Sequence, residues 1–511
     1  MHADLIHINR RTLKTGEALA KSWMVSPDGR EYTLHLRRGL RFSDGHSMDA
    51  DDVVFTFNLH LDPNTHSAQR DLLVIQGKPI SVLRVDSYAV RFRLAAPYAA
   101  AERIFDSIAI LPSHRLRASY EGGRLTQSWG LNTQPTEIAG LGPFRLKEYV
   151  PGQRVVLERN PHYWKADRDG RRLPYLDEII ILFIPSDDAQ AIRFQSGELH
   201  VISSLTAQNS LALQKRNSSK AFRVYDAGPG LEYAFLFFNL NSSTSQADAR
   251  KTEKQVWFQH PLFRRAVSAA IDRESIVRIV YSGLGDPLWG NVTRGNDLWL
   301  NRNIKRSTRS LTEARNLLKQ ASFSWKDETL IDAGGRPVDF SILVSAANPQ
   351  RAQIATIIQE DLRQLGMRVS VVSLESRAML DRVFNRREFE AGVLAFTSGD
   401  ADPNSDMNVW LSTGSLHVWN TQGRPDTPWE LEIDRLMRLQ MITLRYLDRK
   451  KLYDRVQDLV AEHLPIICTS SPHILSAATE RLANFQPTIV RPYTLWNAES
   501  LYFRRITTGR Q

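Results

Sequence analysis

The stretch PVDFSILVSAANPQRAQIATIIQEDLRQLGMRVSVVSL, residues 337–374, shows most clearly how this chain folds. Its first apolar run, residues 338–344, has the length and composition of a buried strand. Residues 353–365 then repeat isoleucine and leucine at spacings of three and four, which is typical of one buried helical face. Gly366 ends this helix, and residues 367–374 alternate as a second strand. Because strand, helix and strand follow one another, the segment predicts a βαβ unit and α/β layers.

Similar periodicity extends outward from this unit. Residues 312–321 predict a helix that begins after the capping residue Ser310. Residues 261–280 predict a single longer helix, closed by Gly283. Residues 32–37 and 154–159 alternate between apolar and polar side chains, as half-exposed antiparallel strands do. The chain therefore combines α/β regions with an N-terminal section that is rich in antiparallel strands.

The length of 511 residues predicts about three domain-sized units. The composition changes after residues 236–241 and again near residues 476–480, so we expect the chain to cross between two lobes at these places. The predicted division is an antiparallel-rich subdomain of lobe I at 1–138, a core subdomain of lobe I at 139–240 plus 478–511, and an α/β lobe II at 241–477.

Composition and charge exclude several classes of protein. No apolar run approaches the roughly 18 residues of a membrane helix. The net charge of +10 fits a polyanionic partner or a solvated basic surface, but the arginine pairs are scattered doublets. We therefore expect no nucleic acid partner. The single cysteine, Cys468, rules out an intrachain disulfide and lies in an apolar run, where a buried role is expected.

The sequence carries no motif of a hydrolase, a metalloprotease or a phosphate-binding loop. The adjacent acids Asp51-Asp52 and Asp187-Asp188 point to different sides of any regular element, so they make poor acid–base pairs. We predict that the protein is not an enzyme and that it holds neither a cofactor nor a metal.

Several short segments match one family in order along the chain. They are LAKSW at 19–23, SPDGREYT at 26–33, FSDG at 42–45, DADDVVF at 49–55, GLGPF at 140–144, LERNPHYW at 157–164, FRRA at 263–266, EARNLL at 313–318 and LGMRV at 365–369. Together they resemble the family 5 extracellular solute-binding proteins. These are the dipeptide and oligopeptide receptors of ATP-binding-cassette (ABC) importers.

The resemblance implies a periplasmic-binding-protein-like, two-lobed α/β fold of type II, in the large three-subdomain form with hinge strands. It implies a monomer that captures a peptide or a peptide-like small solute in an interlobe cleft and delivers it to the transmembrane subunits of an ABC permease. Such a protein works in the periplasm or at the cell envelope. The start, Met1-His2-Ala3-Asp4, has no export signal, so we expect that an upstream segment is missing from this sequence. Two alternatives stay open: a cytoplasmic solute-sensing regulator, and the same fold binding nickel, haem or an oligosaccharide.

The resemblance also points to ligand-binding residues. Asp400 follows Ser398-Gly399 at the end of an apolar strand, where peptide-binding members pair a carboxylate with the ligand amine; a loop turn is the alternative. Arg351 lies with Asn348 in a loop where dipeptide-binding members place an arginine for the ligand carboxylate, and a solvated loop arginine is the alternative. Trp410 and Trp419 flank residues 412–415 and are candidate walls of the pocket, although Trp419 fits the edge of a core equally well.

Overall fold

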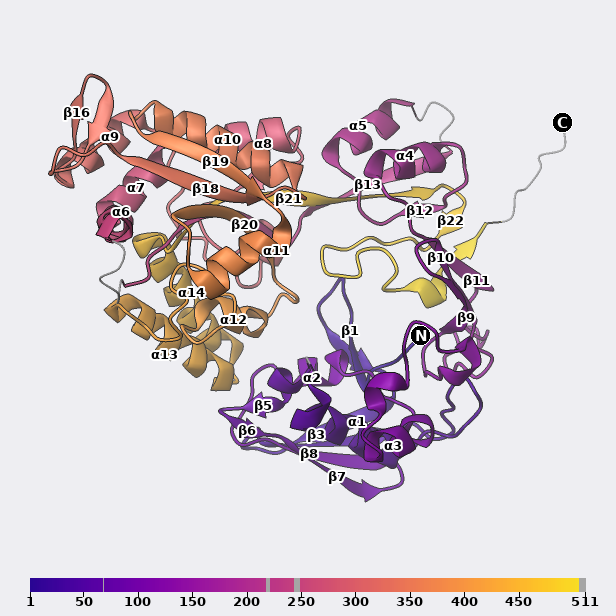
Figure 1. Ribbon diagram of the computed structural model, residues 1–511. Helices are drawn as coiled ribbons and strands as arrows, with labels where there is room; N and C mark the ends of the chain where they lie inside the picture. Colours follow the sequence, from indigo (N-terminus) through magenta and orange to yellow (C-terminus); the bar gives the residue numbers. More distant parts are fainter. Residues whose placement is uncertain (68, 217–220, 243–248, 505–511) are drawn as a thin grey trace.

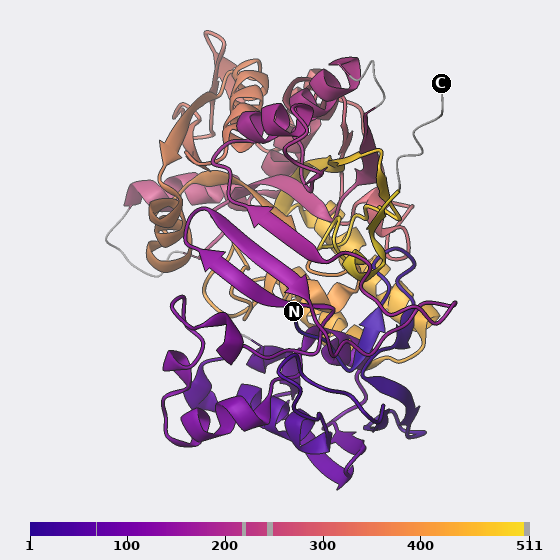
Figure 2. The ribbon, with the colours of Figure 1, turned by 90° about the vertical axis from the view of Figure 1, so that its right-hand side faces the viewer.

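A computed structural model describes residues 1–67, 69–216, 221–242 and 249–504, and it shows three packed parts (Figure 1). The N-terminal subdomain lies at the bottom, the large α/β lobe lies at the upper left, and the remaining part lies on the right. In the view turned by 90° the N-terminal subdomain again lies below the rest of the chain (Figure 2). Residues 505–511 of the predicted core subdomain lie outside the described residues.

The N-terminal subdomain is built on an antiparallel sheet of order β3-β4-β8-β7. Its main elements are β1 (Ile6–Ile8), β2 (Thr15–Glu17), β3 (Ala20–Val25), β4 (Glu31–Leu36), α1 (Ala50–Leu61), β7 (Ser81–Asp86), β8 (Ala89–Arg93), α2 (Ala101–Ser107) and α3 (Ser113–Glu121). Strand β4 confirms the predicted alternation, because every second residue is buried in the subdomain's core. Gly29 has a φ of +68° in the turn between β3 and β4, which explains the Asp-Gly pair there.

The core subdomain carries a second antiparallel sheet of order β11-β10-β9. Its elements are β9 (Phe144–Val150), β10 (Arg154–Arg159), β11 (Glu178–Leu182), α4 (Asp187–Gln195), β12 (Val201–Ile202), α5 (Ala207–Arg216) and β13 (Phe222–Pro229). Strand β10 has the bounds that the sequence predicted. Two small apolar clusters pack this part against the end of a long strand, β21 (Ile466–Thr479).

The largest sheet reaches from β12 of the core subdomain into lobe II, and its strands run in the order β12-β21-β14-β20-β18-β19. Strands β18 (Asp339–Ser345) and β19 (Arg368–Leu374) are parallel and are joined by helix α10 (Pro349–Arg363), so the predicted βαβ unit is confirmed. Gly366 has a φ of +83°, as expected of a residue that ends a helix in the left-handed region. Strands β14 (Glu232–Phe238) and β20 (Ala391–Thr397) complete the buried centre of this sheet.

The helices of lobe II pack around this sheet and share one apolar core with it. They are α6 (Ala249–Gln259), α7 (Pro261–Ala270), α8 (Arg273–Val280), α9 (Leu311–Gln320), α11 (Ser376–Leu380), α12 (Met407–Trp410), α13 (Pro428–Ile442) and α14 (Tyr446–His463). The short strand β15 (Gly285–Pro287) pairs with β21. Helix α9 begins after Ser310, whose side chain accepts a hydrogen bond from the backbone of Glu313, as the sequence predicted.

The single helix expected over residues 261–280 is wrong. The chain forms α7 and α8, because Asp272 caps the second helix by accepting hydrogen bonds from the backbone and hydroxyl of Ser275. Its own backbone N–H donates to the buried carboxylate of Asp361 at 2.8 Å, and this contact holds the break in place. The spacing of apolar residues did not reveal the break between α7 and α8, because the capping residue Asp272 does not interrupt that spacing.

The strand pairing favours a crossing between lobes earlier in the chain than the composition indicated. All of β14 pairs with β20 and belongs to the core of lobe II, although the sequence division assigned it to lobe I. The pairing of β21 passes from β14 at Ser470 to β13 at His473, so the change of partner falls near Pro472. We therefore propose lobe boundaries near Gly230 and Pro472 in place of 240/241 and 477/478.

Among the described residues, no helix combines the length and the apolar character that a membrane span requires.

Candidate functional site

Asp400 lies directly beyond the end of β20, but its carboxylate already has a cation. Arg103, from α2 of the N-terminal subdomain, forms an ion pair with Asp400 and places its Nε 3.5 Å from Asp402. Both side chains of the Arg103–Asp400 pair are about one fifth exposed. The pair therefore joins lobe I to lobe II at the position where the sequence placed a ligand amine.

Asp402 is held from inside lobe II. Both of its oxygens accept hydrogen bonds from Arg449 of α14, each at 2.6 Å, and both side chains are nearly fully buried. Burial alone would raise the pKa of Asp402, but the hydrogen bonds and charge of Arg449 outweigh it and lower that pKa. We call Arg103, Asp400, Asp402 and Arg449 the interlobe ion cluster.

Other contacts between the N-terminal subdomain and lobe II lie beside the interlobe ion cluster. The backbone N–H of Ala99 donates to the carbonyl of Met441 at 2.8 Å, and Met441 packs against the core of the N-terminal subdomain. The side chain of Leu444 lies close against Gly29. These contacts show that the two parts touch along one edge, and a separation of the parts there would break the Arg103 ion pairs as well.

Asn348 and Arg351 lie at the start of α10. The side chain of Asn348 caps this helix by accepting a hydrogen bond from the backbone N–H of Arg351 at 2.9 Å. The guanidinium of Arg351 is half-buried and near Tyr281, whose pKa burial raises to about 12 while Arg351 opposes the rise. Arg351 therefore lies in the first turn of α10, and not in a loop as the sequence predicted. Because β18 and β20 are parallel neighbours, the start of α10 and the loop that holds Asp400 lie at the same edge of the sheet. No hydrogen bond or ion pair joins Asp400 to Arg351 in the described part of the chain.

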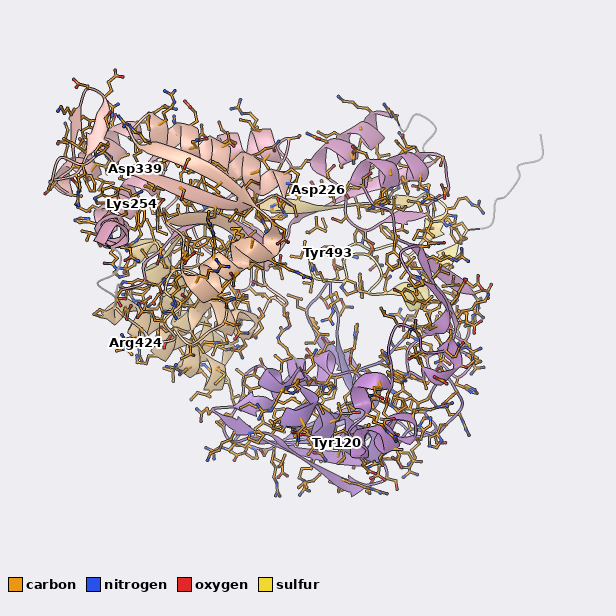
Figure 3. All side chains as sticks on the ribbon, viewed as in Figure 1. Tyr120, Asp226, Lys254, Asp339, Arg424 and Tyr493 are labelled. Carbon is orange, nitrogen blue, oxygen red and sulfur yellow. The ribbon has the colours of Figure 1, made fainter. Side chains whose placement is uncertain are left out.

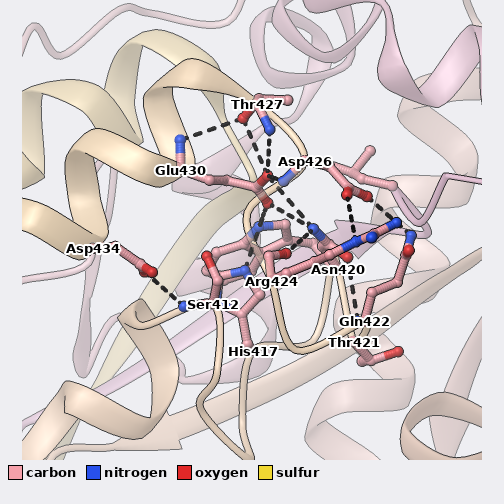
Figure 4. Close-up of polar contacts among 12 residues, drawn as sticks. Ser412, His417, Asn420, Thr421, Gln422, Arg424, Asp426, Thr427, Glu430 and Asp434 are labelled. Carbon is pink, nitrogen blue, oxygen red and sulfur yellow. Dashed lines mark hydrogen bonds and ion pairs between the residues drawn. The ribbon is translucent and has the colours of Figure 1, made fainter.

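Trp410 and Trp419 are fully buried in the core of lobe II, with ring centroids 5.7 Å apart. The indole N–H of Trp419 donates to Glu430 at 3.0 Å, inside a network that fixes residues 412–427 on α13 (Figure 4). Glu430 also accepts from the backbone of Asp426 at 2.8 Å. Neither indole presents a surface to a solute in this structure, and Trp419 takes the core position that the sequence left open.

A cavity of about 760 Å³ lies between the lobes, within the usual size range of small-molecule sites. The loop between β1 and β2, strand β13, residues 294–306 of lobe II and the C-terminal loop contribute its walls. The lining residues are Arg10, Arg11, Ala227, Pro229, Arg294, Gly295, Asp297, Leu300, Arg302, Arg306, Pro487, Thr488 and Ile489. Figure 3 shows how the C-terminal loop, marked by Tyr493, lies at the centre of the molecule between the lobes.

Sequence reasoning missed Arg103 and all five arginines of this cavity. Arg103 lies almost 300 residues before Asp400, and it occupies an ordinary amphipathic helix. The cavity arginines come from segments that no periodic pattern links. The adjacent pair Arg10-Arg11 was a visible signal, but similar doublets occur throughout the chain.

Groups of three or more His, Cys, Asp or Glu side chains that are placed to hold a metal ion are absent from the residues that the structure describes. Cys468 is free and buried, and burial raises its thiol pKa to about 12.

Comparison with known proteins matches residues 14–416 to the bacterial extracellular solute-binding proteins, family 5. The chain is 26% identical over 502 residues to the "Probable ABC transporter-binding protein" of Deinococcus radiodurans, covering 94% of this chain and 83% of that protein. It is 26% identical over 487 residues to the oligopeptide-binding protein AppA of Bacillus subtilis, covering 92% and 80%.

The solved structure of that AppA with a bound nonapeptide superposes with a TM-score of 0.75 at 23% identity, over 99% of this chain and 93% of that one. This likeness shows the two-lobed α/β fold that the sequence resemblance implied. The matched region covers most of the chain, and the protein therefore belongs to the family 5 bacterial extracellular solute-binding proteins.

Proposed function

We propose that this protein captures a peptide or peptide-like solute between its lobes and delivers it to the transmembrane subunits of an ABC importer. The observation that carries the proposal is the interlobe cavity of about 760 Å³, which takes its walls from both lobes. A solute that touches both walls gains contacts only when the lobes are together, so binding favours the closed form. The names of relatives such as the oligopeptide-binding protein AppA support a peptide cargo.

The hinge follows from the strand pairing. The chain passes from β13 to β14 near Gly230 and returns along β21, whose partner changes near Pro472. Gly228 has a φ of +84° beside this crossing, a backbone conformation that glycine adopts without strain. We propose that rotation about these strands opens and closes the lobes, and that the protein acts as a monomer in the periplasm or at the cell envelope.

Asp400 and Arg351 remain predictions as partners of a solute amine and carboxylate. For Asp400 that role requires the solute to displace Arg103, since one carboxylate oxygen is already engaged in the ion pair. Arg351 requires no such displacement, because among the described residues its guanidinium has neither a hydrogen bond nor an ion pair.

The proposal is tested by thermal-shift screening of dipeptide and oligopeptide pools, with small-angle scattering of the purified protein. A peptide ligand is expected to raise the melting temperature and reduce the radius of gyration together. A pool of sugars and a nickel salt serve as controls for the other cargo classes. Stabilisation by a control class with none by any peptide would reject a peptide cargo, and no compaction with any solute would reject the clamp itself.

A further inference from the structure

The cavity between the lobes is strongly basic. Five arginines line it and a single carboxylate, Asp297, stands among them. Arg10 and Arg11 belong to the N-terminal subdomain, whereas Arg294, Arg302 and Arg306 belong to lobe II. Positive charge therefore faces the cavity from both sides, and closing the lobes onto an empty cavity brings like charges together.

Three of these arginines are neutralised by acids. Arg10 pairs with the buried Asp106 at 2.8 Å, Arg294 forms a two-pronged contact with Asp286, and Arg302 pairs with Asp297. Each of these guanidinium groups therefore brings no net charge to the cavity.

The other two cavity arginines have no acidic partner in the described part of the chain. The guanidinium of Arg11 donates only to the neutral side-chain oxygen of Gln486, at 3.4 Å, and the guanidinium of Arg306 makes neither a hydrogen bond nor an ion pair there. Arg11 and Arg306 come from opposite lobes and both are exposed. The cavity thus retains two positive charges, one on each wall.

The acids at the end of β20, Asp400 and Asp402, lie outside the lining of this cavity, and both already have partners. A cationic solute group would require a free carboxylate, but Asp400 pairs with Arg103 and Asp402 pairs with Arg449. A guanidinium binds carboxylate and phosphate in a planar, two-pronged geometry, so unpaired arginines favour anionic groups. Among the described residues that line it, the cavity accordingly offers a solute two unpaired arginines and no unpaired carboxylate, since Asp297 pairs with Arg302.

We propose that the solute of this protein is an organic anion that carries at least two carboxylate groups, one bound by Arg11 and one by Arg306. This inference rests on the proposed function, because it uses the interlobe cavity as the solute site. An acidic peptide and a non-peptide polycarboxylate share this chemistry. In either case the anion removes the repulsion between the two walls, and this couples its capture to closure of the lobes.

The test is isothermal titration calorimetry of the purified full chain with Glu-Glu, Gln-Gln, Lys-Lys and citrate. Glu-Glu or citrate is expected to bind at least about ten-fold more tightly than Gln-Gln, the value of one charged hydrogen bond. Tight binding of Glu-Glu supports an acidic peptide. Tight binding of citrate alone supports a polycarboxylate and contradicts a peptide cargo.

Variants locate the site. R11Q and R306Q are each expected to raise the dissociation constant of the bound anion about ten-fold, because each removes one charged contact. Both side chains are exposed, so the melting temperature without solute should stay unchanged. R363Q is the matched control, since it removes an exposed arginine of α10 that lies outside the cavity lining.

Binding of Gln-Gln or Lys-Lys as tight as that of the anions would overturn the anion inference while leaving solute capture intact. An equal loss of affinity in R363Q would also overturn it, because the effect would then come from overall charge. Failure of all four solutes and of the peptide pools would overturn the proposed function along with it.

Discussion

The ion pair between Arg103 and Asp400 should bias the protein without solute toward the closed form. Arg103 contacts the carboxylates of Asp400 and Asp402 from across the lobe interface. A hydrogen bond to a charged group contributes about 1.5–3 kcal/mol when it is shielded from water. Since Arg103 and Asp400 are 23% and 21% exposed, about 2 kcal/mol is a reasonable value for the contact. Arg103→Gln should then shift the ratio of closed to open molecules about thirty-fold toward open.

Single-molecule fluorescence energy transfer measures this ratio directly. Dyes on cysteines introduced at Lys78 and Lys319 report the distance between the N-terminal subdomain and lobe II, since both positions are exposed while Cys468 is buried. Arg84→Gln is the control, because it removes an exposed ion pair with Asp51 inside the N-terminal subdomain. The same distribution of distances in Arg103→Gln and the parent protein, or equal opening of the lobes in Arg84→Gln, would show that the Arg103–Asp400 pair does not hold the lobes together.

Three further changes test the interior of lobe II. Asp402→Asn should lower the free energy of unfolding by about 3–5 kcal/mol, because it leaves the buried Arg449 without its counter-ion; urea titration measures this, and a loss under 1 kcal/mol would contradict a paired interior charge. Burial raises the pKa of Asp406 to about 6, so the folded protein holds a proton that the unfolded chain releases from about pH 4 upward. This carboxyl therefore lowers the free energy of unfolding as the pH rises from about 4 to 6. Asp406→Asn should raise that free energy over the parent protein by up to about 3 kcal/mol at pH 7–8 but little at pH 4, and equal gains at both pH values would contradict the raised pKa. Trp410→Ala should lower the free energy of unfolding by about 3–5 kcal/mol, and the folded variant should bind its solute with unchanged affinity. A loss of solute affinity in calorimetry without a loss of stability would show that Trp410 contacts the solute.

Local features of the sequence predicted a large part of the fold. The helix and strands of residues 337–374 formed as the spacing of apolar residues indicated, and Gly366 took the positive φ that ends the helix. The ordered motifs identified the family, and its two-lobed fold came with that assignment. These features are readable because side chains three and four residues apart share a helical face and alternate residues share a strand face.

The candidate site was less accessible to sequence reasoning. Asp400 was placed correctly at a strand end, but its cation proved to be Arg103 of another subdomain. Trp410 and Trp419 lie in the core of lobe II and not at the pocket. Their burial depends on how the segment that carries them packs against α13, where Trp419 donates to Glu430, and the local sequence does not show this packing.

Local patterns in the chain were enough to predict the family, the βαβ unit and a few other elements such as β4, β10 and α9, because these depend on neighbours a few residues apart. The place where the chain crosses between lobes, the charges that meet there and the charges left unpaired in the cavity follow only from the folded arrangement. Charges leave no periodic trace in a sequence, because an ion pair depends on the distance between two groups in space. Nothing in the local sequence distinguishes Arg11 and Arg306 from other arginines, and only the fold places them on opposite walls of one cavity.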